Sequence, residues 1–116
     1  MNPRIRRMEA TIAALTPLCD PDVLAACRRL AATDGQHFVD QAIAVIGNAR
    51  LTPAAEAHLE RTMEEFVAGQ CAGVRASGAN EQETLAYALA CTIAIATRIQ
   101  EVQRAEREIA RGAAVN

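Results

Sequence analysis

The longest stretch of the chain without a helix breaker constrains its fold most. Residues 81 to 111 contain neither proline nor glycine, and Asn80 followed by Glu83 has the spacing of a capping box. A helix from 81 to 111 would be roughly 45 Å long at ~1.5 Å per residue. A compact domain of this size has a radius of gyration of only about 13 Å. The sequence therefore predicts a long C-terminal helix that extends beyond its own domain, or else an elongated domain.

The apolar pattern of this helix changes along its length. Residues 85 to 96 are apolar on nearly all sides, which is typical of a helix surrounded by others. Beyond Thr97 only a narrow stripe remains, with the width of a coiled-coil seam. In heptads, its two core positions are Leu85, Thr92, Ile99 and Glu106, and Ala88, Ile95, Val102 and Ile109. We expect another helix to cover this seam, either the first helix folded back or the same helix of a second subunit.

Glu106 is the exception in the seam. A carboxylate at a core position is costly unless an arginine pairs with it. Alternatively, the helix frays before Glu106 and leaves it in water.

Four shorter helices are expected before the long one. Pro3 to Leu15 carries apolar residues at three- and four-residue steps. A second helix, capped by Asp20, should run from Pro21 to about Ala32 and bury Val23, Leu24, Cys27 and Leu30. The segment "ATDGQ" predicts a break, with Thr33 or Asp34 capping a third helix that ends at Gly47 and Asn48. Thr52 and Pro53 predict the start of a fourth helix, which Gly69 and Gly73 would kink or bring close to another helix. We therefore predict an all-α bundle of about five helices in one domain, residues 1–116.

Composition and charge argue against nucleic-acid binding. The 116 residues include 12 basic and 14 acidic ones, a formal net charge of −2, so the sequence lacks the basic excess typical of such proteins. Residues 23 to 46 superficially suggest a helix–turn–helix, and a DNA-binding regulator stays open as the less favoured alternative. Its second helix would offer the DNA mainly Gln36, His37, Asp40 and Gln41, which include no cation.

Cysteine spacing and the N-terminal residues indicate a reducing compartment. Cys19, Cys27, Cys71 and Cys91 form no CxxC pair and no zinc pattern, so we expect them to act as small core residues. The N-terminal residues lack an apolar signal-peptide core, and the apolar stretch "LAYALACTIAIA" is too short to span a bilayer. These features favour a cytoplasmic protein without membrane contacts.

No residue pattern indicates catalysis, a metal or a cofactor. His37 is expected in an exposed first helical turn and His58 on a solvated helix face. Glu56 precedes His58 by two residues rather than the three of a di-metal motif. A ligand pocket between helices, in a sensor or an enzyme, is the main alternative. Tyr87 and Thr92 are the polar groups that could orient a ligand there.

The favoured function is therefore a non-enzymatic protein–protein interaction module, such as a small bacterial regulator, inhibitor or adaptor. It would bind a partner protein and form a homodimer through its C-terminal helix. The predicted interface is the seam with its flanking charges: Ile95, Ile99, Val102, Glu106, Ile109, Arg98 and Arg104.

Overall fold

The computed structural model describes residues 2–46 and 52–115, and these residues form four α-helices and one short 3-10 helix. The helices are α1 (Pro3–Leu15), α2 (Pro21–Ile46), α3 (Pro53–Ala76) and α4 (Glu81–Val115), and the 3-10 helix η1 (Thr16–Leu18) follows α1. The described residues include no strand, which confirms the all-α prediction. The helix count of about five was slightly too high.

The difference in number arises in α2, which passes through residues 33 to 36 without a break. The predicted cap Asp34 faces the core instead, where its carboxylate accepts hydrogen bonds from Tyr87 and Gln70. Gly35 is buried against α4 rather than placed in a turn. Tertiary contacts thus hold both residues in helical conformation and override their local preference for a turn. The predicted stop at Gly47 and Asn48 lies outside the described residues.

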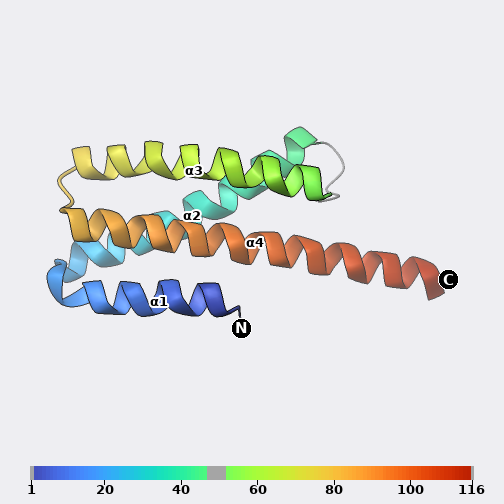
Figure 1. Cartoon of the computed structure of the whole chain (residues 1–116), viewed down its shortest axis with the longest axis horizontal. Helices are drawn as coiled ribbons and strands as arrows, with labels where there is room; N and C mark the ends of the chain where they lie inside the picture. The colour runs from blue at the N-terminus through green and yellow to red at the C-terminus, as the bar shows by residue number, and fades with distance from the viewer. Residues whose placement is uncertain (1, 47–51, 116) are drawn as a thin grey trace.

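Helix α4 lies at the centre of the bundle and contacts all three other α-helices (Figure 1). α1 and α3 lie along opposite sides of it, and α2 crosses behind it. One apolar core joins α2, α3 and α4; its buried members are Cys27, Ala31, Val39, Val74, Tyr87, Cys91 and Ile95. The rings of Phe38 in α2 and Phe66 in α3 stack with their centroids 4.8 Å apart, and both pack against this core.

Gly35 lies where α2 and α4 approach each other closely. A Cβ atom on Gly35 would lie 2.6 Å from the Cβ of Ala94 and 3.0 Å from the carbonyl oxygen of Cys91. Gly69 and Gly73, which we expected to allow a close crossing or a kink, have no neighbouring atom within 4 Å of such a Cβ. The close crossing is therefore on α2, and α3 runs unbroken from Pro53 to Ala76.

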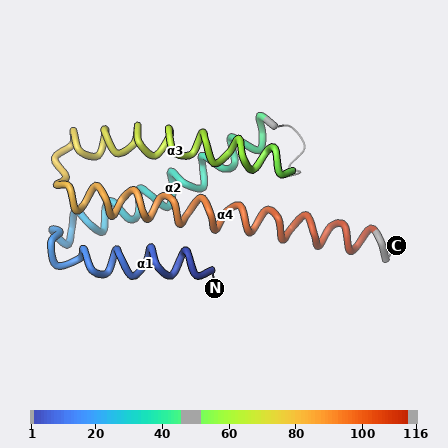
Figure 2. Tube along the Cα trace, viewed as in Figure 1, coloured from blue at the N-terminus to red at the C-terminus, as the bar shows by residue number. Residues whose placement is uncertain are grey.

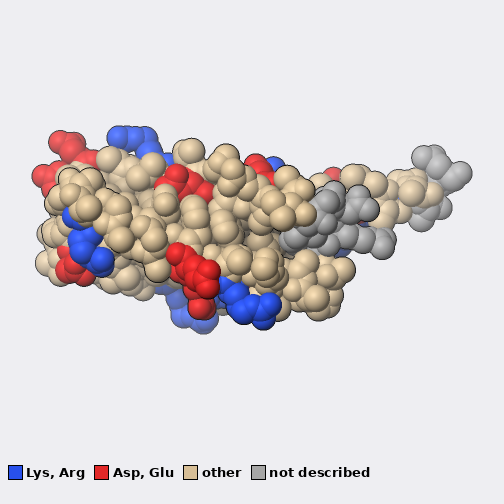
Figure 3. Space-filling view, turned by 90° about the horizontal axis from the view of Figure 1, so that it is seen from above, with Lys and Arg blue, Asp and Glu red and all other residues tan. Residues whose placement is uncertain are grey.

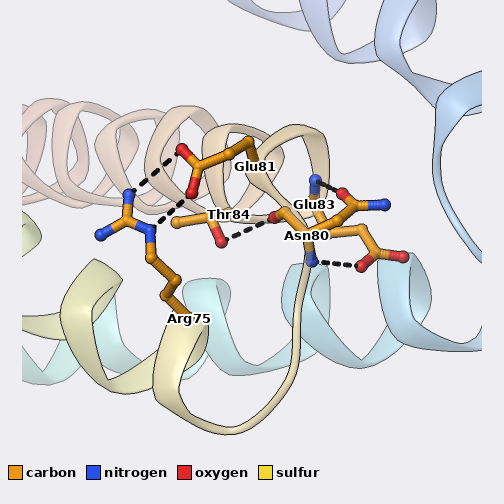
Figure 4. A network of polar contacts seen from close by, with 5 residues as sticks. All are labelled: Arg75, Asn80, Glu81, Glu83 and Thr84. Carbon is orange, nitrogen blue, oxygen red and sulfur yellow. Dashed lines mark hydrogen bonds and ion pairs between the residues drawn. The ribbon is translucent and has the colours of Figure 1, made fainter.

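Three of the four capping predictions are confirmed, and the cap at Thr33 or Asp34 is the one that is wrong. The Asp20 side chain accepts from the backbone N–H groups of Asp22 and Val23, and the Thr52 hydroxyl accepts from that of Ala55. Asn80 and Glu83 form the reciprocal capping box, with both distances 2.8 Å (Figure 4). These caps form because each depends only on residues two or three positions apart.

Glu83 has a second role that joins two helix ends. Its side chain is 4% exposed, and its other carboxylate oxygen accepts from the backbone N–H of Asp20 at 2.8 Å. One carboxylate therefore binds the capping residues of both α2 and α4. It fixes the start of the long helix against the rest of the bundle.

Helix α4 is a single rod and makes the molecule elongated. The described chain measures 54 × 27 × 20 Å with a radius of gyration of 15.9 Å, larger than the ~13 Å of a compact domain. The helix does not break at Thr97, and its C-terminal end projects beyond the ends of α1 and α3 (Figure 2). The expectation of a helix longer than its bundle is thus confirmed.

By length and composition, one described helix could cross a membrane, namely α4 over Glu81–Ala113. The sequence-based expectation rested only on the shorter stretch 85–96, so it does not exclude this. In the bundle, however, Tyr87, Cys91 and Ile95 of this helix form the protein core. A central helix of a soluble bundle has the same composition, so a cytoplasmic location stays a prediction.

Candidate functional site at the free end of α4

The predicted seam on α4 passes from the core of the bundle into solvent. Ile95 is 1% exposed and Ile99 packs against the core, so the chain's own helices already cover this part. Val102 and Glu106 are half-buried, and Ile109 is 74% exposed. The bundle therefore leaves the last part of the seam open, and Leu85 at its start is also 46% exposed.

Two polar contacts show where the bundle ends along α4. Gln103 donates to the carboxylate of Glu56 in the first turn of α3, at 2.6 Å. Arg98 contacts Asp40 of α2 at 2.8 Å and Glu101 at 3.2 Å, and these hydrogen bonds raise the pKa of its guanidinium. The predicted interface residue Arg98 is thus bound within the chain.

Every residue from Arg107 to Ala113 is open to solvent. Arg104, Arg107 and Arg111 recur at three- and four-residue steps and share one side of the helix. None of the three forms an ion pair with another described residue. Ala105, Ile109 and Ala113 lie along another side and form a thin apolar edge. We call residues 104–113 the α4 tip.

Glu106 lies where the seam leaves the bundle. The predicted pairing with arginine is not seen among the described residues, and the helix does not fray before it. Its Oε1 atom is shielded from solvent and has no hydrogen-bond partner within the described ranges. Buried carboxylate oxygens are rarely left without a hydrogen-bond donor.

Tyr87 and Thr92, the candidates for binding a ligand, do not face a common cavity. Tyr87 is fully buried, and its hydroxyl donates to Oδ2 of Asp34 at 2.7 Å; Gln70 donates to the same oxygen at 3.1 Å. Burial and the bond to Asp34 raise the pKa of Tyr87. Thr92 donates to the carbonyl of Ala88 and lines a small groove of about 110 Å³ between α1, α3 and α4. Pockets for small ligands usually measure about 300–1,000 Å³.

Among the described residues, the cysteines and histidines form no cluster typical of a catalytic or metal-binding site. Cys27 and Cys91 are buried, Cys19 and Cys71 are half-buried, and all four are free thiols. Burial raises the pKa of each thiol, in Cys91 to about 11. His37 and His58 are exposed, and within the described ranges no three His, Cys, Asp or Glu side chains are placed to hold a metal ion. His37 lies in the middle of α2 rather than in a first helical turn.

The helix–turn–helix motif on which the DNA-binding alternative rests is not formed by residues 23 to 46. Residues 23 to 46 belong to the single helix α2, so they contain no turn between two helices. On the face shown in Figure 3, basic and acidic side chains are mixed and no large basic patch is seen.

Sequence reasoning missed an exposed apolar stripe on α2. It assigned Val23 and Leu30 to the buried side, but they are 36% and 47% exposed, whereas Leu24 and Cys27 are buried. Val23 and Leu30 line a groove of about 370 Å³ between α2 and the C-terminal end of α3. The signal was in the sequence: the apolar residues of 23 to 31 cover a wider arc of the helix than one neighbour can bury.

No protein-family model matches the chain, and neither the curated proteins nor the solved structures contain one that is detectably similar to it.

Proposed function

We propose that this protein is a non-enzymatic interaction module that binds a partner protein through the α4 tip. The observation that carries the proposal is a continuous helix whose last turns lie outside the bundle with Ile109 open to solvent. Short helices without tertiary contacts are marginally stable in water, because most helical stability comes from packing an apolar face. A projecting helix with an apolar anchor is therefore suited to binding in another protein's groove.

The side chains of the tip indicate the chemistry of that groove. Ile109 supplies one large apolar anchor, with Ala105 and Ala113 as small neighbours that allow close approach. The three arginines beside this edge favour a groove bordered by carboxylates, because guanidinium groups bind carboxylates in a bidentate manner. Such charges chiefly set the rate and specificity of association, and the apolar anchor supplies most of the affinity.

Self-association through the same helix, as expected from the sequence, would use a short part of the seam. Ile95 and Ile99 are packed inside the bundle, so Val102, Glu106 and Ile109 are left for a second copy. A regulator, inhibitor or adaptor in a bacterial cytoplasm is the role we propose for such a module.

The experiment compares capture of proteins from the source cell by three immobilised forms of the chain. Wild type and Val45→Asp are expected to capture the same partner in equal amounts. Ile109→Asp is expected to capture about tenfold less of it, or even less. Val45 is the matched control because it is also apolar and 88% exposed but lies at the end of α2. A partner retained equally by all three forms would refute the α4 tip as the binding site.

A further inference from the structure

The apolar stripe on α2 is exposed together with two charges that flank it. Val23, Ala26 and Leu30 lie on one face of α2 at three- and four-residue steps, and all three are open to solvent. Asp22 and Arg29 lie along one edge of this face and are exposed as well. Neither forms an ion pair with another residue that the structure describes.

The arrangement of these residues is symmetric about Ala26. Val23 and Leu30 are seven residues apart, as are Asp22 and Arg29, and the midpoint of each pair lies within half a residue of position 26. Consider two antiparallel copies of α2 related by a twofold axis that passes between them at Ala26. The numbers of two facing positions then add up to 52. The edge of one helix that carries Asp22 and Arg29 lies beside the same edge of the other helix. Such an axis at Ala26 places Val23 near Leu30 of the second copy, and Asp22 near its Arg29.

The groove beside α2 provides room for the second copy. Its floor and far wall include Cys27, Val74 and Ala79, and its volume is about 370 Å³. Ala26 at the crossing point is small, so the two helices can approach closely. The Leu30 side chain of each copy then enters the groove of the other.

We propose that two copies of this chain form a twofold dimer through the α2 stripe, defined as Asp22, Val23, Ala26, Arg29 and Leu30. The self-complementary charge pattern favours a second copy as the occupant, because two antiparallel copies of α2 form two opposite-charge pairs with no other chain required. The stripe covers about two helical turns, so the interface is small and the dimer dissociates on dilution. This dimer uses a surface separate from the α4 tip and leaves that tip free.

Sedimentation velocity over a concentration series tests the dimer with charge-reversed variants. In Arg29→Asp, two carboxylates meet at each end of the interface, and in Asp22→Arg two guanidinium groups meet there. Each variant alone is expected to dimerise at least about tenfold more weakly than wild type, because like charges in contact oppose association. An equimolar mixture restores the dimer, since the mixed pair has opposite charges at both ends.

The outcomes separate this proposal from its rivals. Ala26→Glu is expected to be monomeric and Ile109→Asp to dimerise as wild type does, with the helical circular dichroism of each variant unchanged. A monomeric wild type at the highest soluble concentration would overturn the proposal, as would a mixture that fails to associate. A dimer lost in Ile109→Asp and kept in Ala26→Glu would also overturn it, because it would place self-association on the α4 tip.

Discussion

Replacement of Gly35 by alanine tests the packing that places α4 at the centre of the fold. Helix propensity alone predicts a stabilisation of about 1 kcal/mol, because glycine is the less favourable residue inside a helix. The structure predicts the opposite. The new Cβ would lie 2.6 Å from the Cβ of Ala94, 3.0 Å from the Cys91 carbonyl oxygen and 3.2 Å from the Ile95 nitrogen. None of these atoms is the far end of a flexible side chain, so a backbone must move.

Overpacking of this kind costs about 1–3 kcal/mol, and contact with rigid atoms favours the upper end. After the gain in propensity, we expect a net loss of about 2 kcal/mol, which lowers the melting temperature of a chain this size by about 8 °C. Thermal unfolding followed by circular dichroism at 222 nm measures it. Gly69→Ala and Gly73→Ala are the matched controls, because both sites are in α3 with open space around them. Each control is expected to gain about 0.5–1 kcal/mol.

A Gly35→Ala chain as stable as the two controls would refute the close crossing of α2 and α4. The double variant Gly35→Ala/Ala94→Gly gives a further check, because it removes the shortest contact. The double variant should be more stable, by about 1 kcal/mol, than the sum of the two single changes in unfolding free energy predicts. For two sites that do not touch, the single changes would simply add up.

Three other predictions concern buried polar groups. Glu83→Gln should lower the free energy of unfolding by about 2 kcal/mol in urea titration, because an amide has one acceptor oxygen for the two backbone N–H groups bound by the carboxylate; an unchanged midpoint would contradict the shared cap. Tyr87→Phe should cost about 2 kcal/mol and leave the fold intact, since Asp34 then loses its 2.7 Å hydroxyl donor. For Cys91, burial raises the pKa from 9.0 to about 11, so its neutral thiol is favoured in the folded state. Its contribution to stability is complete below pH 9.0 and is lost as the pH rises to about 11; equal labelling rates of Cys91 by a thiol reagent in native and unfolded protein at pH 8 would contradict this.

Local features of the fold were predictable, because they depend on neighbours in the sequence. Asp20, Thr52 and the Asn80–Glu83 pair each satisfy backbone groups two or three residues away, so their caps follow from the sequence. The unbroken run after Asn80 likewise predicted one long helix. Nothing local, however, shows that Glu83 also binds the backbone of Asp20, 63 residues away.

The mistaken break at residues 33–36 has a tertiary cause. Asp34 and Gly35 favour a turn when only their neighbours are considered. In the bundle the carboxylate of Asp34 binds Tyr87 and Gln70, and the missing side chain of Gly35 admits Ala94. The partners of both residues belong to other helices, so a local pattern does not show them.

The heptad pattern predicted an apolar seam on α4 but not how much of it the bundle covers. A seam alone does not specify which helix packs against it. Because α1, α2 and α3 pack around α4, Ile95 and Ile99 became core residues, whereas Leu85 near the start of the seam and Ile109 near its end stayed exposed. The α2 stripe was missed because Val23 and Leu30 were taken as inward-facing with Leu24.

The most direct test of the interaction module is hydrogen exchange of the α4 amides, measured in the free protein and with the captured partner bound. In the free protein we expect slow exchange from about Thr84 to Gln103 and fast exchange from Arg107 to Ala113, because only the first segment is packed in the bundle. On binding, the amides from Arg107 to Ala113 should become strongly protected. Protection that appears elsewhere and leaves these amides exchanging as fast as before would contradict the account.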